Sequence, residues 1–155
     1  MPFERMVRAV DEWAGREGRS DVFAQIGPAD SSDPDVWEPR HIAWTRFLDP
    51  PDFQQRVNEA KVLVAHAGMG SIITALQAGK PILVMPRRGD LQETRNDHQV
   101  ATAERFYKMG RVRAAFDETQ LVQELANLRA LRSTEHVSAW ASEDLLEAIR
   151  HFIDR

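Results

Sequence analysis

The apolar residues of this chain follow two kinds of pattern, a helical spacing of three to four residues and short continuous runs. The helical spacing predicts a first helix over residues 3–14, ended by Gly15 and Gly18. One face of that helix carries its apolar side chains: Phe3, Met6, Val7, Val10 and Trp13. The continuous runs cover residues 61–65 (KVLVA) and 82–85 (ILVM). Such runs are typical of strands buried on both faces.

Weaker patterns and turn residues predict the remaining elements. Further strands are expected over residues 21–26, 41–48 and 112–116. Further helices are expected from Pro50, over residues 69–78 and 97–109, from Asp117, and over residues 138–153. Gly79 suits the left-handed cap that ends the 69–78 helix. Gln120, three residues after Asp117, completes a capping box.

The order of these elements predicts the fold class. Strands that alternate with helices indicate parallel pairing and right-handed crossovers, so we expect an α/β, Rossmann-like three-layer domain with a parallel sheet. One domain is expected over residues 1–155, with the helix at 138–153 packed on the core or docked on a partner. Such sheets bind ligands at the carboxyl ends of their strands. His66, residues 86–88 and Gly27 follow three strands, and the first two are expected to lie side by side.

Composition excludes several classes of function. The 155 residues carry a formal net charge of −4 without a lysine- or arginine-rich run, so a nucleic-acid partner is not indicated. No cysteine is present, which excludes disulfides and thiolate chemistry and fits a reducing cytoplasm. No apolar run reaches the roughly 20 residues of a membrane-spanning helix, and residues 2–5 are not expected to begin a signal peptide. Membrane association is therefore expected only through a partner or a surface patch.

Residues 66–71 (HAGMGS) form a glycine-containing turn that has two interpretations. Gly68 and Gly70 allow close backbone approach beside the free N–H groups of a helix start, which suits a phosphate or pyrophosphate. The Ser71 hydroxyl and a His66 ring N–H add two further donors. A plain strand-to-helix turn with Ser71 as a cap explains the same residues equally well. The turn is neither a Walker loop nor a strict GxGxxG motif.

Residues 96–99 (NDHQ) form a second polar group at a predicted helix start. Side-chain amides and acids there suit the hydroxyls of a sugar, whereas a lone Asn or Asp at such a position is more commonly a cap. In the preceding loop, Arg87 and Arg88 are candidate phosphate ligands, with simple solvation as the alternative. Glu93 in the same loop is expected to lie on the surface.

These two groups together, in this order and spacing, resemble the carboxyl-terminal half of a GT-B glycosyltransferase. More narrowly, the chain is similar to the glycosyltransferase family 28 C-terminal domain in its short, stand-alone form. That form includes a subunit of the N-acetylglucosaminyl transferase and bacterial exopolysaccharide subunits. The resemblance covers roughly residues 2–120. It rests on four segments: PFERMVRAVDEWA, VFAQIG, AHAGMGSIITALQAGKPILVMPR and NDHQVATAERFYKMGRV.

The resemblance implies that the domain binds a nucleotide sugar, most often a UDP-sugar. The residues implied for the pyrophosphate are His66, Gly68, Gly70 and Ser71. His98 and Gln99 would face the donor sugar, and Gly27 would lie near the nucleobase. No cofactor is implied, and the chain has no Asp-x-Asp motif that would indicate a metal.

The resemblance also implies a two-component enzyme. In this subfamily the acceptor-binding half is a separate, membrane-associated protein. The implied function is therefore the donor-binding subunit of a glycosyltransferase that makes a lipid-linked or exopolysaccharide glycan. No residue of the chain is an obvious general base, so the subunit would be inactive without its partner. It would be cytoplasmic and recruited to the inner face of the membrane by that partner.

Two departures from the family pattern keep an alternative open. Related domains commonly carry a ribose-binding glutamate three residues after the motif serine, and here that position is Thr74. Family members also usually begin with a central strand before the PFERMV helix, so the expected sheet lacks its usual first strand. The alternative function is a non-catalytic interaction subunit with a decayed nucleotide-sugar site. A sugar-nucleotide epimerase is disfavoured because such enzymes need both halves of the GT-B fold.

Overall fold

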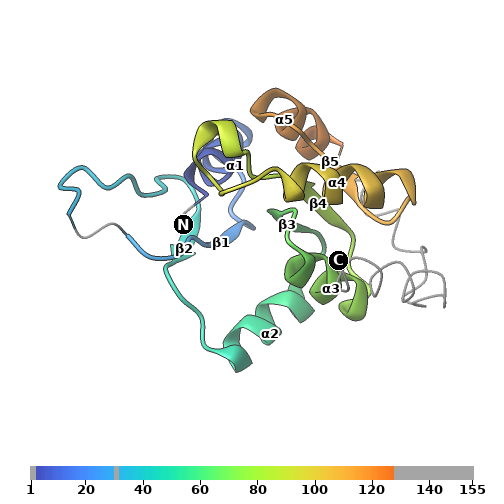
Figure 1. Cartoon of the computed structure of the whole chain (residues 1–155). Coiled ribbons are helices and arrows are strands. Elements are labelled where there is room, and N and C mark those ends of the chain that lie inside the picture. Colours follow the sequence, from blue (N-terminus) through green and yellow to red (C-terminus); the bar gives the residue numbers. More distant parts are fainter. Residues whose placement is uncertain (1–2, 30–31, 128–155) are drawn as a thin grey trace.

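The computed structural model of the 155-residue chain describes residues 3–29 and 32–127 (Figure 1). Its helices are α1 (Glu4–Glu17), α2 (Pro50–Glu59), α3 (Met69–Ala78), α4 (His98–Lys108) and α5 (Glu118–Ala126), with a 3-10 turn, η1, at Gly89–Leu91. Its strands are β1 (Phe23–Gln25), β2 (Ala43–Thr45), β3 (Leu63–His66), β4 (Ile82–Met85) and β5 (Arg113–Ala114). Every element expected within this part of the chain is present. The helix expected over 138–153 lies outside the described residues.

The strands pair only in parallel, in two separate ladders. One ladder joins β1 to β2, and the other has the order β3-β4-β5. In the second ladder His66 lies opposite Met85, so β3 and β4 end at the same level. The predicted α/β class with parallel strands is therefore confirmed. Within the described part of the chain α1 is the first element, and β1 and β3 belong to different ladders.

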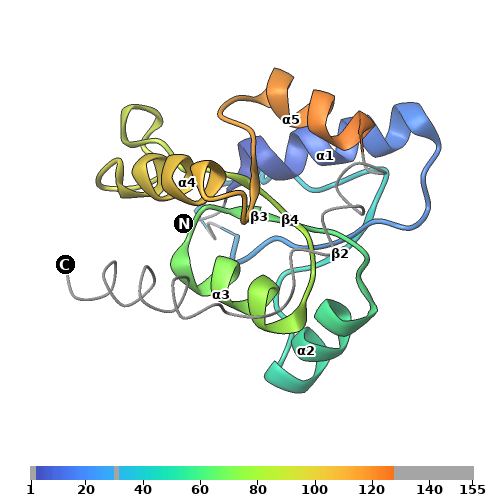
Figure 2. The ribbon, with the colours of Figure 1, turned by 90° about the vertical axis from the view of Figure 1, so that its right-hand side faces the viewer.

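Alternating side chains of β4 divide the core into two halves. Leu83 and Met85 pack with α1 and α5, whereas Ile82 and Val84 pack with α3 and α4. Figure 2 shows α1 and α5 side by side on one face of the strands and α3 on the other. This arrangement gives the expected three layers, with helices covering both faces as parallel sheets require.

The burial expected for β3 is wrong, whereas that expected for β4 is right. All four residues of β3 are only half-buried, and all four residues of β4 are fully buried. The reason is the position of each strand in its ladder. β4 lies between β3 and β5, whereas among the described residues β3 pairs with β4 alone.

The helix ends follow local sequence signals with one exception. Gly79 ends α3 in the left-handed conformation, with φ 65° and ψ 30°, as predicted. Asp117 caps α5 by accepting the Gln120 N–H at 2.7 Å. α1, in contrast, continues through Gly15 and ends at Gly18. Gly15 is needed for close packing instead, because a Cβ there would lie 2.6 Å from the His41 ring.

A buried carboxylate fastens α1 to the amino end of β2. Asp11 is 3% exposed, and it accepts hydrogen bonds from the backbone N–H groups of Arg40, His41 and Ile42 at 2.7–3.2 Å. These bonds satisfy donors that a loop enclosed by protein would otherwise leave unpaired. α1 therefore connects the two ladders, because it also packs on β4.

Candidate functional site

Three segments meet at the carboxyl edge of the β3-β4-β5 ladder. They are the end of β3 at His66, the chain after β4 at Pro86–Arg87, and the first turn of α4 at Gln99. The register of β3 on β4 sets the first two side by side, as the sequence predicted. Gln99 joins them through its side chain. The two polar groups singled out in the sequence are therefore parts of one site.

The imidazole of His66 is the centre of this site. Its Nε2 lies 3.2 Å from the Ser71 hydroxyl oxygen, and its Nδ1 lies 3.1 Å from the Gln99 amide nitrogen. The Gln99 amide oxygen accepts the backbone N–H of Arg87 at 3.0 Å. The ring is therefore held on both sides by side chains from α3 and α4.

The two glycines of the turn have different roles. A Cβ at position 68 would lie 2.3 Å from the Cε1 of His66, so only glycine lets the ring lie against the backbone there. At Gly70, a Cβ would meet no protein atom within 4 Å. Gly68 thus positions the histidine, whereas Gly70 leaves open space above the first turn of α3.

The amino terminus of α3 has no side-chain cap. Its N-cap residue is Gly68, while α2 and α5 are capped by Asp49 and Asp117. The first N–H groups of any helix have no partner within the helix, and they carry a partial positive charge. At α3 these groups lie beside the His66 ring and the Ser71 hydroxyl. Such a combination favours an anionic oxygen.

Burial and a nearby positive charge keep the His66 ring neutral. Burial lowers the pKa of His66 below its usual value, and the charge of Arg87 lowers it further. Burial also lowers the pKa of Arg87, while Glu93 opposes that shift. Neutral imidazole still offers one N–H donor, so the ring can bind an anion without being charged.

The guanidinium of Arg87 is held in place by two contacts. Its guanidinium lies over the Phe3 ring, 5.1 Å from the centroid, and donates to the Glu93 carbonyl at 3.4 Å. Arg5 lies over the same ring, at 5.5 Å. A positive charge is therefore fixed close to the edge at which β4 ends.

Glu93 was expected on the surface, and that expectation is wrong. Its side chain is 12% exposed and forms two hydrogen bonds with Arg5, at 2.8 and 2.9 Å. It also accepts the Arg88 N–H at 3.0 Å. No local pattern marks this role, because its partner on α1 lies 88 residues away in the chain.

The hydrogen bonds of three other predicted site residues go to neighbours other than His66. The Thr74 hydroxyl donates to the Gly70 carbonyl at 2.8 Å, so its proton is used within α3. His98 is exposed in the first turn of α4, where its backbone N–H donates to the side-chain oxygen of Asn96 at 3.1 Å. Gly27 follows β1 in the other ladder and donates to the Arg46 carbonyl at 3.0 Å. A contact between Gly27 and a nucleobase stays a prediction.

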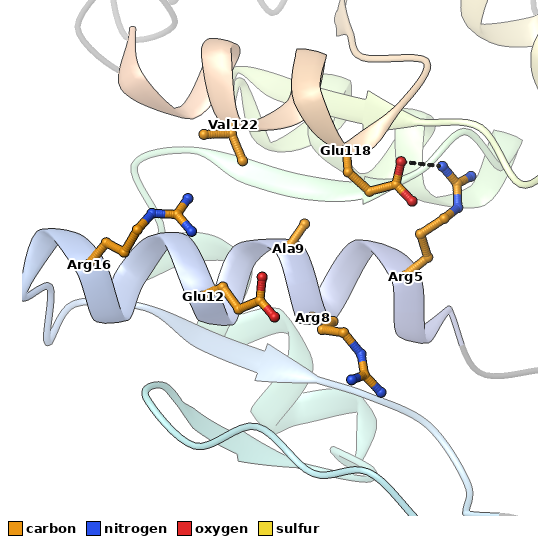
Figure 3. A pocket seen from close by; sticks show the side chains of 7 residues that line it. All are labelled: Arg5, Arg8, Ala9, Glu12, Arg16, Glu118 and Val122. Carbon is orange, nitrogen blue, oxygen red and sulfur yellow. Dashed lines mark ion pairs between the residues drawn. The ribbon is translucent and has the colours of Figure 1, made fainter.

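A groove of about 180 Å³ lies away from His66, between α1 and α5 (Figure 3). The residues that line it are Arg5, Arg8, Ala9, Glu12, Arg16, Glu118 and Val122. Figure 3 shows the Arg5–Glu118 ion pair at one end, where the two groups approach to 3.6 Å. Its lining carries charges of both signs.

The described part of the chain has neither a metal-binding cluster nor a membrane-spanning helix. No group of three or more His, Asp or Glu side chains there could hold a metal ion. None of the helices in residues 3–29 and 32–127 is long and apolar enough to cross a membrane.

Comparison with known proteins gave matches of three kinds. Residues 2–151 match the glycosyltransferase family 28 C-terminal domain. UDP-N-acetylglucosamine transferase subunit ALG13 from two strains of Cryptococcus neoformans var. neoformans serotype D is 39% identical over 66 residues, which are 41% of this chain and 31% of the relative. A crystal structure of the glycotransferase of kitacinnamycin has a TM-score of 0.54 and 24% identity, over 93% of this chain and 38% of that chain. This last likeness supports the fold alone.

Proposed function

The chain belongs to the glycosyltransferase family 28 C-terminal domain family, and on that basis we propose that it binds a nucleotide-sugar donor at the His66 edge. One observation carries the proposal. The uncapped amino terminus of α3, the His66 ring and the fixed charge of Arg87 converge where β3 and β4 end. The matched ALG13 subunits belong to a UDP-N-acetylglucosamine transferase, so UDP-N-acetylglucosamine is the first donor to test.

The pyrophosphate of the donor would be bound without a metal ion. Backbone N–H groups at Gly70 and Ser71 would donate to its oxygens, and the His66 ring would add a further donor. Hydrogen bonds to a charged oxygen are about twice as strong as those between neutral groups. Arg87 would supply the compensating charge from the end of β4.

Contacts to the rest of the donor are less favourable. His98 is exposed near the site, which is consistent with a contact to the donor sugar. The hydroxyl of Thr74 already donates to a helix carbonyl, so it would offer a ribose hydroxyl only an acceptor. We therefore expect weaker ribose binding than a carboxylate at this position would give.

The second half of the reaction would come from another protein. The matched segment spans 31% of the ALG13 subunits, so acceptor binding and catalysis are proposed for a complex and not for this chain alone. The partner would be a membrane-associated protein that carries the acceptor and any general base. The product would be a lipid-linked or exopolysaccharide glycan.

A non-catalytic interaction subunit is the second candidate. The uncharged hydroxyl of Thr74 in place of a carboxylate favours it, because the ribose contact would be weakened. This candidate predicts a folded chain that binds no nucleotide sugar. Binding measurements therefore separate the two candidates directly.

Isothermal titration of the full chain with a panel of nucleotide sugars tests the proposal. We expect wild-type binding, and a Kd about tenfold higher for Gly70→Ala, which is about 1.4 kcal/mol. The added Cβ meets no protein atom within 4 Å, so it would obstruct only the ligand. Gln77→Ala, on the exposed side of α3, is the matched control and should bind as wild type does. Absence of binding by the whole panel, or unchanged binding by Gly70→Ala, would contradict the proposal.

A further inference from the structure

The side-chain amide of Gln99 makes two hydrogen bonds that fix its orientation. The backbone N–H of Arg87 can only donate, so the atom that faces it at 3.0 Å is the amide oxygen. The other end of the amide is then the NH₂ group, and it faces the Nδ1 of His66 at 3.1 Å. Rotating the amide by half a turn would set two donors against each other at Arg87.

The orientation of Gln99 determines where the imidazole carries its proton. An NH₂ group offers only hydrogens, so Nδ1 must accept with its lone pair. In a neutral ring the proton is then on Nε2. That nitrogen lies 3.2 Å from the Ser71 hydroxyl oxygen, which can accept it.

Ser71, His66 and Gln99 are arranged like a serine–histidine–acid triad. The proton of the neutral imidazole, however, is on the opposite ring nitrogen. In such a triad a carboxylate accepts the Nδ1 proton, and Nε2 is left free to take a proton from the serine. Here Nδ1 is occupied by Gln99 and Nε2 already bears the proton. Ser71 is therefore not activated as a nucleophile, and the neutral ring has no lone pair directed at a substrate.

We propose that Gln99 is a positioning residue that holds His66 as a neutral imidazole protonated on Nε2, so that the ring donates to an anionic oxygen and does not act as a general base. The identity of the anion rests on the proposed function, but the state of the ring does not. When a ligand oxygen arrives, it would replace the Ser71 hydroxyl as the acceptor of the Nε2–H, without any proton transfer.

Nitrogen-15 NMR of the histidine rings in the full chain tests this inference without any ligand. The two ring nitrogens of a neutral histidine have well separated shifts, and His66→Asn identifies the signals of His66 among the five histidines. We expect the wild-type ring to be protonated on Nε2 at neutral pH. Protonation on Nδ1, or rapid averaging between the two forms, would overturn the inference.

Two substitutions of Gln99 add a test of cause. Gln99→Glu keeps an acceptor for the Arg87 N–H but presents only oxygen to Nδ1, so it should move the proton to Nδ1 and raise the pKa of His66. Gln99→Met removes both bonds and should leave a mixture of the two tautomers. Gln54→Glu, exposed on α2, adds the same charge elsewhere and should leave the ring unchanged. If both Gln99 variants gave the same His66 spectrum as the wild type, the positioning role would be contradicted.

A pH profile of donor binding separates this inference from the proposed function. UDP-N-acetylglucosamine does not titrate near neutral pH, so any change of its affinity there reports on the protein. In Gln99→Glu, affinity should fall about tenfold as the pH rises through the raised pKa of His66, because the neutral ring then loses its Nε2–H. Wild type should show no such fall. Equal profiles for the two proteins would contradict the inference, whereas absence of wild-type binding would contradict only the proposed function.

Discussion

The two ladders end in edges of opposite character. After β1 and β2 the chain satisfies its own polar groups. The N–H groups of Ile26 and Gly27 donate to the carbonyls of Thr45 and Arg46, and the Gln25 side chain accepts the Leu48 N–H. After β3 the chain enters a helix whose first turn has no side-chain cap, beside a histidine N–H.

The contrast teaches that the edges after β1 and β3 differ in how far the chain pairs its own polar groups. Both edges contain a glycine and both follow a parallel strand. At Gly27 the backbone adopts φ 77°, so the glycine supports a turn that closes on itself. At Gly68 the glycine instead makes room for the His66 ring. Glycine alone therefore does not distinguish the two edges.

α1 is tied to each region by a single carboxylate. Asp11 holds the loop before β2, and Glu93 holds Arg5 near the end of β4. Removing either carboxylate should disturb one region more than the other. The three predictions below use this difference, from the largest expected effect to the smallest.

Asp11→Ala should cause the largest loss of stability. Three backbone N–H groups would lose a buried, charged acceptor, which we expect to lower the free energy of unfolding by about 2–4 kcal/mol. Urea unfolding followed by circular dichroism measures this value. Glu12→Ala, exposed one residue further on, is the control and should change stability by less than about 0.5 kcal/mol. Equal effects of the two substitutions would refute the role of Asp11.

Glu93→Gln should have an intermediate effect on stability. The pair with Arg5 is mostly enclosed, with both side chains under 15% exposed, so losing its charge should cost about 1–2 kcal/mol. Asp90→Asn breaks the exposed pair with Arg88 and should cost less than about 0.5 kcal/mol. The same unfolding experiment compares them. If Asp90→Asn proved the more destabilising, the enclosed pair would not be what holds the loop after β4.

Acid should have the smallest effect, and it should act through His66. Because its pKa is lowered in the folded chain, the unfolded chain binds the proton first as the pH falls below about 6.5. The free energy of unfolding should therefore decrease in that window, by less than about 1 kcal/mol because the ring is only half-buried. His66→Asn should remove this part of the pH dependence, and His98→Asn should retain it. If the free energy of unfolding of His66→Asn depended on pH as that of the wild type does, another group would be responsible.

Local signals in the sequence were enough to predict many elements. α3 and β4 have the predicted ends, because Gly79 and Pro81 interrupt the chain between two strongly apolar segments. The meeting of His66 with residues after β4 also followed from parallel pairing alone. These features depend on neighbours in the chain or on one ladder register.

Features that depend on distant partners could not be predicted. The pairing of Glu93 with Arg5 spans 88 residues, and nothing in a polar loop marks one acid among several. The half-buried state of β3 follows from its place at the edge of its ladder, which its apolar composition conceals. The hydrogen bonds of Gln99 to His66 and Arg87 could not be predicted, and its expected contact with a donor sugar stays a prediction.

The central claim is that the His66 edge binds the pyrophosphate of a nucleotide sugar. Titration of the ¹⁵N-labelled full chain with UDP-N-acetylglucosamine, followed by amide NMR shifts, tests it most directly. The account predicts that the largest shifts fall on the amides of Gly68–Ser71 and on Arg87. Shifts centred on the α1–α5 groove of Figure 3, or no shifts at all, would contradict it.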